Sequence, residues 1–146
     1  MYKFNIEEKS HRLLFDDLYS RWLKTETPVE WINRVITKDP TLGILFDLDK
    51  FKIMNLCIYN IITDKSDLAA LIQVMETVGS STAKEKFEKE ALEYISNLRA
   101  LDNRLKKILF VTTMGNLKRF TKKHDFSLDK IILSKEIKIQ TLTLTE

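Results

Sequence analysis

The side chains best suited to binding chemistry are eight cations concentrated between residues 99 and 123, where Asp102 is the only acid. Lysine and arginine at this density can neutralise phosphates and release counterions, which gives sequence-independent affinity for nucleic acid. The same cations could bind an acidic protein surface equally well. The simplest alternative is that they form a solvated face without a binding role. The cations are Arg99, Arg104, Lys106, Lys107, Lys118, Arg119, Lys122 and Lys123.

Complete catalytic and metal-binding patterns are absent from the sequence. His11 and His124 are the only histidines, and neither has a ligand or triad pattern beside it. Cys57 is the single cysteine and stands in an apolar run, so we expect a buried small hydrophobe. A zinc site would need carboxylates at a ligand spacing that the sequence does not show. We therefore expect no metal site and no cofactor.

The segment Ile44-Leu45-Phe46-Asp47-Leu48-Asp49 resembles the first motif of haloacid-dehalogenase-like phosphatases. In that family a strand delivers a nucleophilic aspartate, and the aspartate two residues on acts as acid/base beside magnesium. The resemblance implies that Asp47 is the nucleophile and Asp49 the acid, with the strand 108–112 similar to the family's phosphate-binding second motif. Phe51 departs from the pattern and the later motifs are missing, so we expect a degenerate site without phosphatase activity. Without the resemblance, either aspartate would cap a helix that carries Phe51.

Residues 117–146 resemble the helix-turn-helix of phage-repressor-like regulators, because Leu117, Phe120, Ile131 and the run 140–142 fall at family-like spacing. The resemblance implies binding to DNA. Three residues depart from the pattern: they replace the small packing residue, a core leucine and the turn glycine. These are Ile132, Lys135 and Glu136.

Helices are expected along most of the chain, because it contains only 3 glycines and 2 prolines. Apolar spacing predicts a helix over 5–24, and the capping box 27–30 opens a second helix that ends at Asp39-Pro40. The stretch 41–63 fits a helix better than short buried strands. Ser66 is expected to cap a helix over 67–78, which Gly79 ends.

The strongest predicted element is a helix over 83–108, where an apolar stripe is wide enough for burial in a bundle. The stretch 108–113 could instead be a buried strand. A short basic helix over 117–124 follows, and the tail 131–146 has strand-like composition with a hairpin about Lys135-Glu136. The stripe is Phe87, Ala91, Tyr94, Leu98, Leu101, Leu105 and Ile108.

These patterns predict a single, mainly α domain over 1–146, a compact bundle of four to six helices that allows a short β-hairpin at the C-terminus. Its helical body would be 1–115 and its basic C-terminal segment 116–146. The N-terminus lacks an apolar signal-peptide core, and no stretch approaches the ~18 uncharged apolar residues of a membrane span. We therefore expect a cytoplasmic protein, in the organism itself or in a host cell.

The function predicted from these features is that of a non-enzymatic helical interaction or regulatory protein. It would bind a protein partner, with oligomer contacts through the 83–108 helix. The alternative is a regulatory nucleic-acid-binding protein that uses the basic segment 99–123, and the degenerate phosphatase-like fold ranks third.

Overall fold

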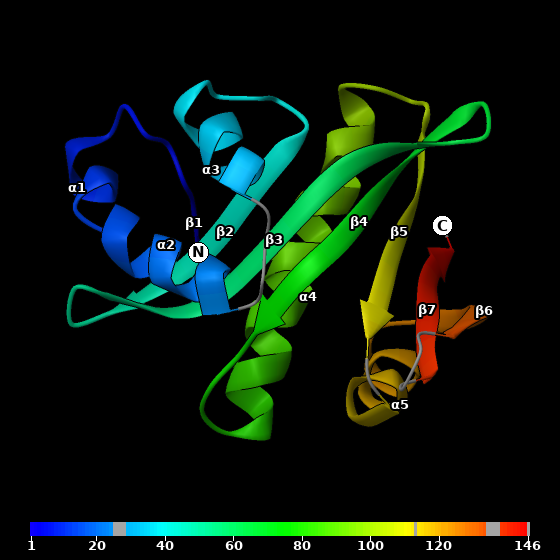
Figure 1. The fold of residues 1–146 in the computed structure, drawn as a ribbon. Helices are drawn as coiled ribbons and strands as arrows, with labels where there is room; N and C mark the ends of the chain where they lie inside the picture. Colours follow the sequence, from blue (N-terminus) through cyan, green and yellow to red (C-terminus); the bar gives the residue numbers. More distant parts are fainter. Residues whose placement is uncertain (25–28, 113, 134–137, 146) are drawn as a thin grey trace.

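A mixed seven-stranded β-sheet with helices on both faces forms the protein, as a computed structural model shows (Figure 1). The structure describes residues 1–24, 29–112, 114–133 and 138–145, with side chains over 1–20, 32–110 and 118–127. The elements in chain order are β1 (Tyr2–Lys3), α1 (Lys9–Arg12), α2 (Phe15–Lys24), α3 (Val29–Ile36), β2 (Leu42–Asp49), β3 (Lys52–Asp64), β4 (Asp67–Glu76), α4 (Ser81–Asn97), the 3-10 helix η1 (Leu98–Ala100), β5 (Leu105–Thr112), α5 (Met114–Lys123), β6 (Phe126–Leu133) and β7 (Lys138–Thr145).

The strands lie in the order β1-β2-β3-β4-β5-β7-β6. Every neighbouring pair is antiparallel except β4 and β5, which run parallel. Parallel neighbours need a crossover connection, and α4 with η1 supplies it behind the sheet in the view of Figure 1.

The prediction of a mainly α bundle is wrong, and the largest error lies in residues 41–78, which form β2, β3 and β4. Both faces of these strands are buried. Ile44 and Phe46 pack toward α2 and α3, whereas Leu45 and Cys57 pack toward α4 and α5. A strand covered on both faces is apolar at every position, so it lacks the alternation that distinguishes a strand from a helix.

Two apolar clusters make up the core, one on each face of the sheet. On one face Leu14, Leu18, Ile32 and Val35 of the N-terminal helical region cover β2 and β3. On the other face α4 and α5 contribute a second set, which is Phe87, Ala91, Leu92, Ile95 and Phe120. The helix α4 therefore buries its predicted stripe against its own sheet.

Helix α4 ends earlier than the periodicity predicts. It stops at Asn97, and Leu101 of the predicted stripe is 86% exposed, while Leu105 and Ile108 are buried within β5. Asp102 accepts hydrogen bonds from the backbone N–H and the guanidinium of Arg104, and this local turn leads the chain into β5. Apolar spacing thus continued across a helix end and into a strand.

The C-terminal predictions had mixed outcomes. The short basic helix is confirmed as α5, and 108–112 is a strand. β6 and β7 pair antiparallel as a hairpin, although its turn about Lys135-Glu136 lies outside the described residues. The helix-turn-helix interpretation is wrong, because strands stand where that motif needs helices.

The hairpin between β2 and β3 turns at Lys50 and Phe51, whose φ angles are 49° and 66°. Phe51 is 92% exposed and packs in neither cluster, and the helix that Asp47 or Asp49 was expected to cap is replaced by this hairpin. No helix in the described part of the chain is long and apolar enough to cross a membrane.

Gly43 offers a test of the packing between β2 and β3. A Cβ added at this position would overlap the ring of Tyr59, which is buried beside it. We expect Gly43→Ala to destabilise the fold by ~1–3 kcal/mol, the usual cost of overpacking. Urea denaturation would measure this. Adding Tyr59→Leu, which removes the ring, should recover part of the loss, and an unchanged midpoint in Gly43→Ala alone would contradict the packing.

Candidate functional site

The carboxyl ends of β4 and β5 mark the place where the sheet opens. The two strands pair from Leu68↔Leu105 to Ile72↔Phe110 and pair no further. β4 continues to Glu76 against β3, and β5 continues to Thr112 against β7. Figure 1 shows the two strands diverging beyond this point. Backbone groups on the facing edges of parted strands can bind an extended ligand in place of a strand.

A β-bulge lies next to the parting. Ile58 pairs with Val74 and Tyr59 pairs with Ile72, so Gln73 is the extra residue on β4. Bulges bend a strand and re-aim its side chains, and they are common beside active sites. This bulge directly follows the last parallel pair, so it separates the paired part of β4 from the part that diverges.

The β4–α4 connection, residues 77–80, leads from the parting to the N-terminus of α4. Gly79 has a φ of 99°, and the hydroxyl of Ser80 accepts a hydrogen bond from the N–H of Ala83. The first turn of α4 contains no acid. Among the described residues, the N–H groups of Ser81 and Thr82 have no protein acceptor. A helix terminus of this kind favours an anion through its free N–H groups and its dipole.

Asn55 of β3 anchors this connection from within the core. It is 2% exposed, and its Oδ1 accepts the N–H of Val78 at 3.0 Å. Its Nδ2 donates to Oδ2 of Asp47 on β2 at 3.3 Å. Asp47 lies directly opposite Asn55 in the strand register, and its Oδ1 is 3.2 Å from the amine of Met1.

A buried ionic cluster of Glu88, Arg119 and His124 joins α4 to α5. The carboxylate of Glu88 is 0% exposed and accepts two hydrogen bonds from the guanidinium of Arg119, at 3.1 and 2.6 Å. Nε2 of His124 lies 3.2 Å from Oε1 of Glu88. Because α4 follows β4 and α5 follows β5, this cluster connects the two halves of the sheet just past the point where they part.

The Glu88 cluster keeps the carboxylate charged. Burial raises the pKa of Glu88, but hydrogen bonds from His124 and Arg119 and the charges of both residues outweigh it. The net effect is a pKa below the ordinary value of 4.5. The low pKa reflects structural pairing, because both oxygens of the carboxylate are already occupied by protein donors.

The eight predicted cations fall into two groups separated by β5. Arg99 and Arg104 precede this strand and Lys106 and Lys107 begin it, whereas the other four lie on α5 beyond its end. An eight-residue strand is roughly 26 Å long, so the groups do not form one patch. Four of the cations lie in ion pairs within the chain: Arg104 with Asp102, Lys107 with Asp64, Arg119 with Glu88, and Lys123 with Glu85. A binding role for these residues stays a prediction.

The phosphatase-like interpretation is wrong. Asp47 is on β2 and the segment 108–112 is β5, so two strands separate the supposed nucleophile from its phosphate-binding partner. With strands ~4.8 Å apart, the separation is roughly 14 Å. Asp49 is exposed at the far end of β2.

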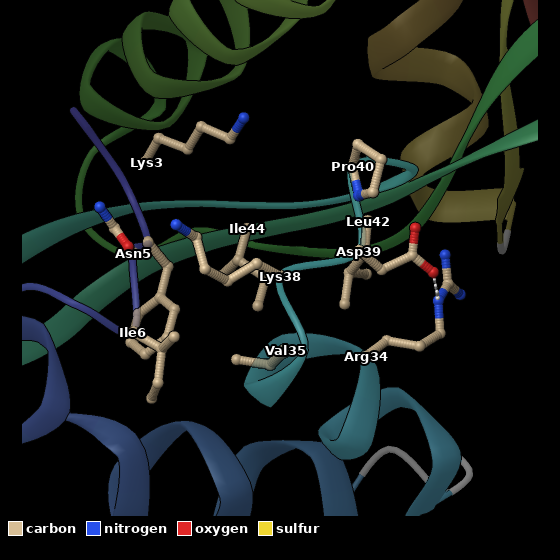
Figure 2. A pocket seen from close by; sticks show the side chains of 11 residues that line it. Lys3, Asn5, Ile6, Arg34, Val35, Lys38, Asp39, Pro40, Leu42 and Ile44 are labelled. Carbon is tan, nitrogen blue, oxygen red and sulfur yellow. Dashed lines mark hydrogen bonds and ion pairs between the residues drawn. The ribbon is translucent and has the colours of Figure 1, made fainter.

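A cavity of about 500 Å³ lies at the β1–β2 edge of the sheet (Figure 2). Apolar side chains such as Phe4, Val35 and Ile44 line it, together with the charged side chain of Lys38. Arg34 also lines it and donates to Asp39 at 2.6 Å, and Asn60 accepts from the same guanidinium. Backbone and hydroxyl hydrogen bonds from Thr41, with Arg34, lower the pKa of Asp39. This cavity is remote from the parting of β4 and β5.

The sequence matches no protein-family model and no curated protein. Its fold, however, is similar to solved acetyltransferase structures. An aminoglycoside 6'-acetyltransferase type Ii is 12% identical, with a TM-score of 0.64 over 99% of this chain and 97% of that chain. A ribosomal-protein-S5-alanine acetyltransferase from Vibrio fischeri is 13% identical, with a TM-score of 0.61 over 82% and 72%. A GNAT family acetyltransferase from Elizabethkingia anophelis with acetyl-CoA bound is 12% identical, with a TM-score of 0.50 over 82% and 84%.

At these identities the likeness shows the fold, which is the α/β fold of GNAT acetyltransferases. It overturns the prediction of a non-enzymatic helical interaction or regulatory protein, because that prediction rested on a helical bundle. The nucleic-acid-binding alternative fits the fold no better, since it rested on one continuous basic segment and on a helix-turn-helix that is absent from the described residues.

Sequence reasoning missed Asn55 and Glu88. Asn55 lies in the stretch 41–63, which was predicted to be a helix, and a polar residue among apolar ones in a helix does not indicate a functional role. Glu88 looked like an ordinary surface residue of α4. The signal that could have found it is its place next to Phe87 of the apolar stripe, with Arg119 on the following helix and His124 directly after that helix as possible partners.

Removing the guanidinium of Arg119 should leave the carboxylate of Glu88 buried without its main partner. We expect Arg119→Met to destabilise the fold by about 3 kcal/mol, at the low end of the range for broken buried pairs because Arg119 is 28% exposed. Lys118→Met, next to it and exposed, is the matched control. Equal urea midpoints for the two variants would contradict a stabilising Glu88 cluster.

Acid should weaken the same cluster. Because the pKa of Glu88 is lower in the folded chain than its ordinary 4.5, its contribution is complete above that value and is lost as the pH falls through the folded pKa. We therefore expect Glu88→Gln to lower stability at pH 7, and the difference from wild type to shrink as pH drops below 4.5. Glu93→Gln, on the exposed face of α4, should show no such convergence in denaturation series across pH.

Proposed function

We propose that this protein is an acyltransferase that moves an acyl group from a coenzyme A thioester to an amine. The observation that carries the proposal is the parting of β4 and β5 beside a bulge, with the N-terminus of α4 following directly, in a fold that matches an aminoglycoside acetyltransferase over nearly its full length. The acetyl-CoA bound to a protein of the same fold supports a coenzyme A thioester as the donor.

The described residues fit the donor's diphosphate. The N–H groups of Ser81 and Thr82 are available, no acid stands in the first turn of α4, and Lys84 and Lys86 follow. The β4–α4 connection has four residues and one glycine. It therefore offers fewer amides than the glycine-rich loops that usually cradle diphosphates. We expect donor affinity to depend on the helix terminus more than on the connection.

The reaction proposed is a simple displacement. The acceptor nitrogen forms a bond to the thioester carbonyl carbon, and the carbon–sulfur bond breaks. The amine proton passes to the departing sulfur, so the products are an amide and the free thiol of coenzyme A. The parted strands contribute by holding the extended donor in a fixed orientation, which converts a bimolecular encounter into a positioned one.

A negative charge placed in the first turn of α4 should have opposite effects on the stability of the fold and on ligand binding. Glutamate near a helix N-terminus stabilises the helix by about 0.3–1 kcal/mol, whereas it repels a bound diphosphate. We expect Thr82→Glu to keep or raise the melting temperature and to weaken acetyl-CoA binding by at least ~10-fold, which corresponds to 1.4 kcal/mol. Asn33→Glu on α3 is exposed and carries the same charge change as a control.

Calorimetric titration with acetyl-CoA and a thiol-release assay with a panel of primary amines would provide the measurements. Wild-type protein that binds neither acetyl-CoA nor coenzyme A at about 1 mM, the limit of weak specific binding, would overturn the proposal. Equal binding by Thr82→Glu and Asn33→Glu would overturn the assignment of the α4 N-terminus.

A further inference from the structure

Asn55 is a buried polar side chain whose hydrogen bonds link three separate parts of the chain. It is 2% exposed, it lies on β3, and it contacts Asp47 on β2 and Val78 in the β4–α4 connection. A buried amide is retained at a cost unless its polar atoms are paired. One partner of the Asn55 amide, the N–H of Val78, lies in the connection that precedes α4.

The orientation of the Asn55 amide is fixed by its partners. Only Nδ2 can donate and only Oδ1 can accept. Because the carboxylate of Asp47 accepts at 3.3 Å, Nδ2 faces β2 and Oδ1 faces the N–H of Val78 at 3.0 Å. Asp47 and Asn55 also stand directly opposite each other in the register, so the backbone holds the pair together.

Val78 lies two residues before Ser80, whose hydroxyl caps α4. Its neighbour Gly79 has a φ of 99°, in the left-handed region that favours glycine, within the connection that leads from β4 into α4. The hydrogen bond that Val78 donates to Asn55 therefore fixes the connection on one side of Gly79, and the cap fixes it on the other. The place of the free N–H groups at the start of α4 depends on both.

We propose that Asn55, oriented by Asp47, is a positioning residue that sets the β4–α4 connection for binding of the acyl donor. This inference rests on the proposed function. Asn55 has no contact with the donor in this scheme and acts through the backbone of Val78. Removal of the Asn55 side chain should weaken donor binding equally in the ground state and the transition state. We therefore expect a raised KM and an unchanged kcat.

The strand register allows a reciprocal test. In Asn55→Asp the new carboxylate would face that of Asp47, and the repulsion should turn it away from Val78. In the double variant Asp47→Asn/Asn55→Asp the amide and the carboxylate exchange places. The new amide on β2 can donate to the new carboxylate on β3, whose second oxygen can again accept the N–H of Val78. Asn55→Leu removes both hydrogen bonds without adding a charge.

Two measurements decide the outcome. Amide hydrogen exchange at Val78 reports the connection without any ligand, and calorimetry with acetyl-CoA plus steady-state kinetics reports the donor. We expect Asn55→Leu and Asn55→Asp to lose protection at Val78 and to raise the Kd and KM for acetyl-CoA by roughly 10-fold, as for loss of a directed contact. The double variant should recover both quantities.

Several results would overturn this assignment. Unchanged protection at Val78 in Asn55→Leu would show that the hydrogen bond does not hold the connection. Lost protection with unchanged donor affinity would show that the connection does not position the donor. Failure of the double variant to recover where Asn55→Asp is impaired would contradict the orienting role of Asp47. A wild-type protein that binds no acetyl-CoA would instead end the proposed function itself, and it is recognised separately because it appears without any substitution.

Discussion

The opening between β4 and β5 depends on the buried pairing of Glu88 with Arg119. Two strands that diverge leave backbone groups unpaired and a sheet divided into two parts, a condition that has to be stabilised elsewhere. The protein does so through α4 and α5, the helices that follow these strands, and a carboxylate with 0% exposure locks one to the other. His124 occupies a further position on the same oxygen as Arg119, so no lone charge remains in the core. The strands β4 and β5 can part because the helices α4 and α5 that follow them are joined to each other.

The N-terminal half of α4 is therefore constrained by two polar contacts made in an apolar setting. Glu88 ties its second turn to α5, and Asn55 ties the connection before its first turn to β3. The stripe of Phe87, Ala91 and Ile95 packs α4 on the sheet from the second turn onward. Apolar burial gives α4 its strength of attachment, whereas the polar contacts give it a defined position along its axis, because apolar packing is non-directional.

How far the sequence predicted this arrangement depended on whether local pattern and tertiary environment agreed. The helices 29–36 and 114–123 and the C-terminal hairpin were found because their signals are local. The strands 42–76 were mistaken for helices because helices cover both sheet faces, and residues such as Leu45 and Phe46 are equally buried on opposite sides. The scarcity of glycine added to the error, since turns here use Lys38, Lys50 and Lys65 with positive φ, where glycine or asparagine would be usual. The candidate site could not be predicted, because Asn55 and Val78 meet only through strand pairing.

The place of β7 within the sheet has a consequence for how the protein is made. Strand β7 is inserted between β5 and β6, although it comes after both in the chain. Until residue 145 has left the ribosome, one long edge of β5 has no partner, and the apolar segment 108–111 is attached to an unpaired strand edge. Such edges invite pairing with other chains. The N-terminal part of the sheet can assemble during synthesis, whereas β5 gains its second partner only once residues 138–145 are available.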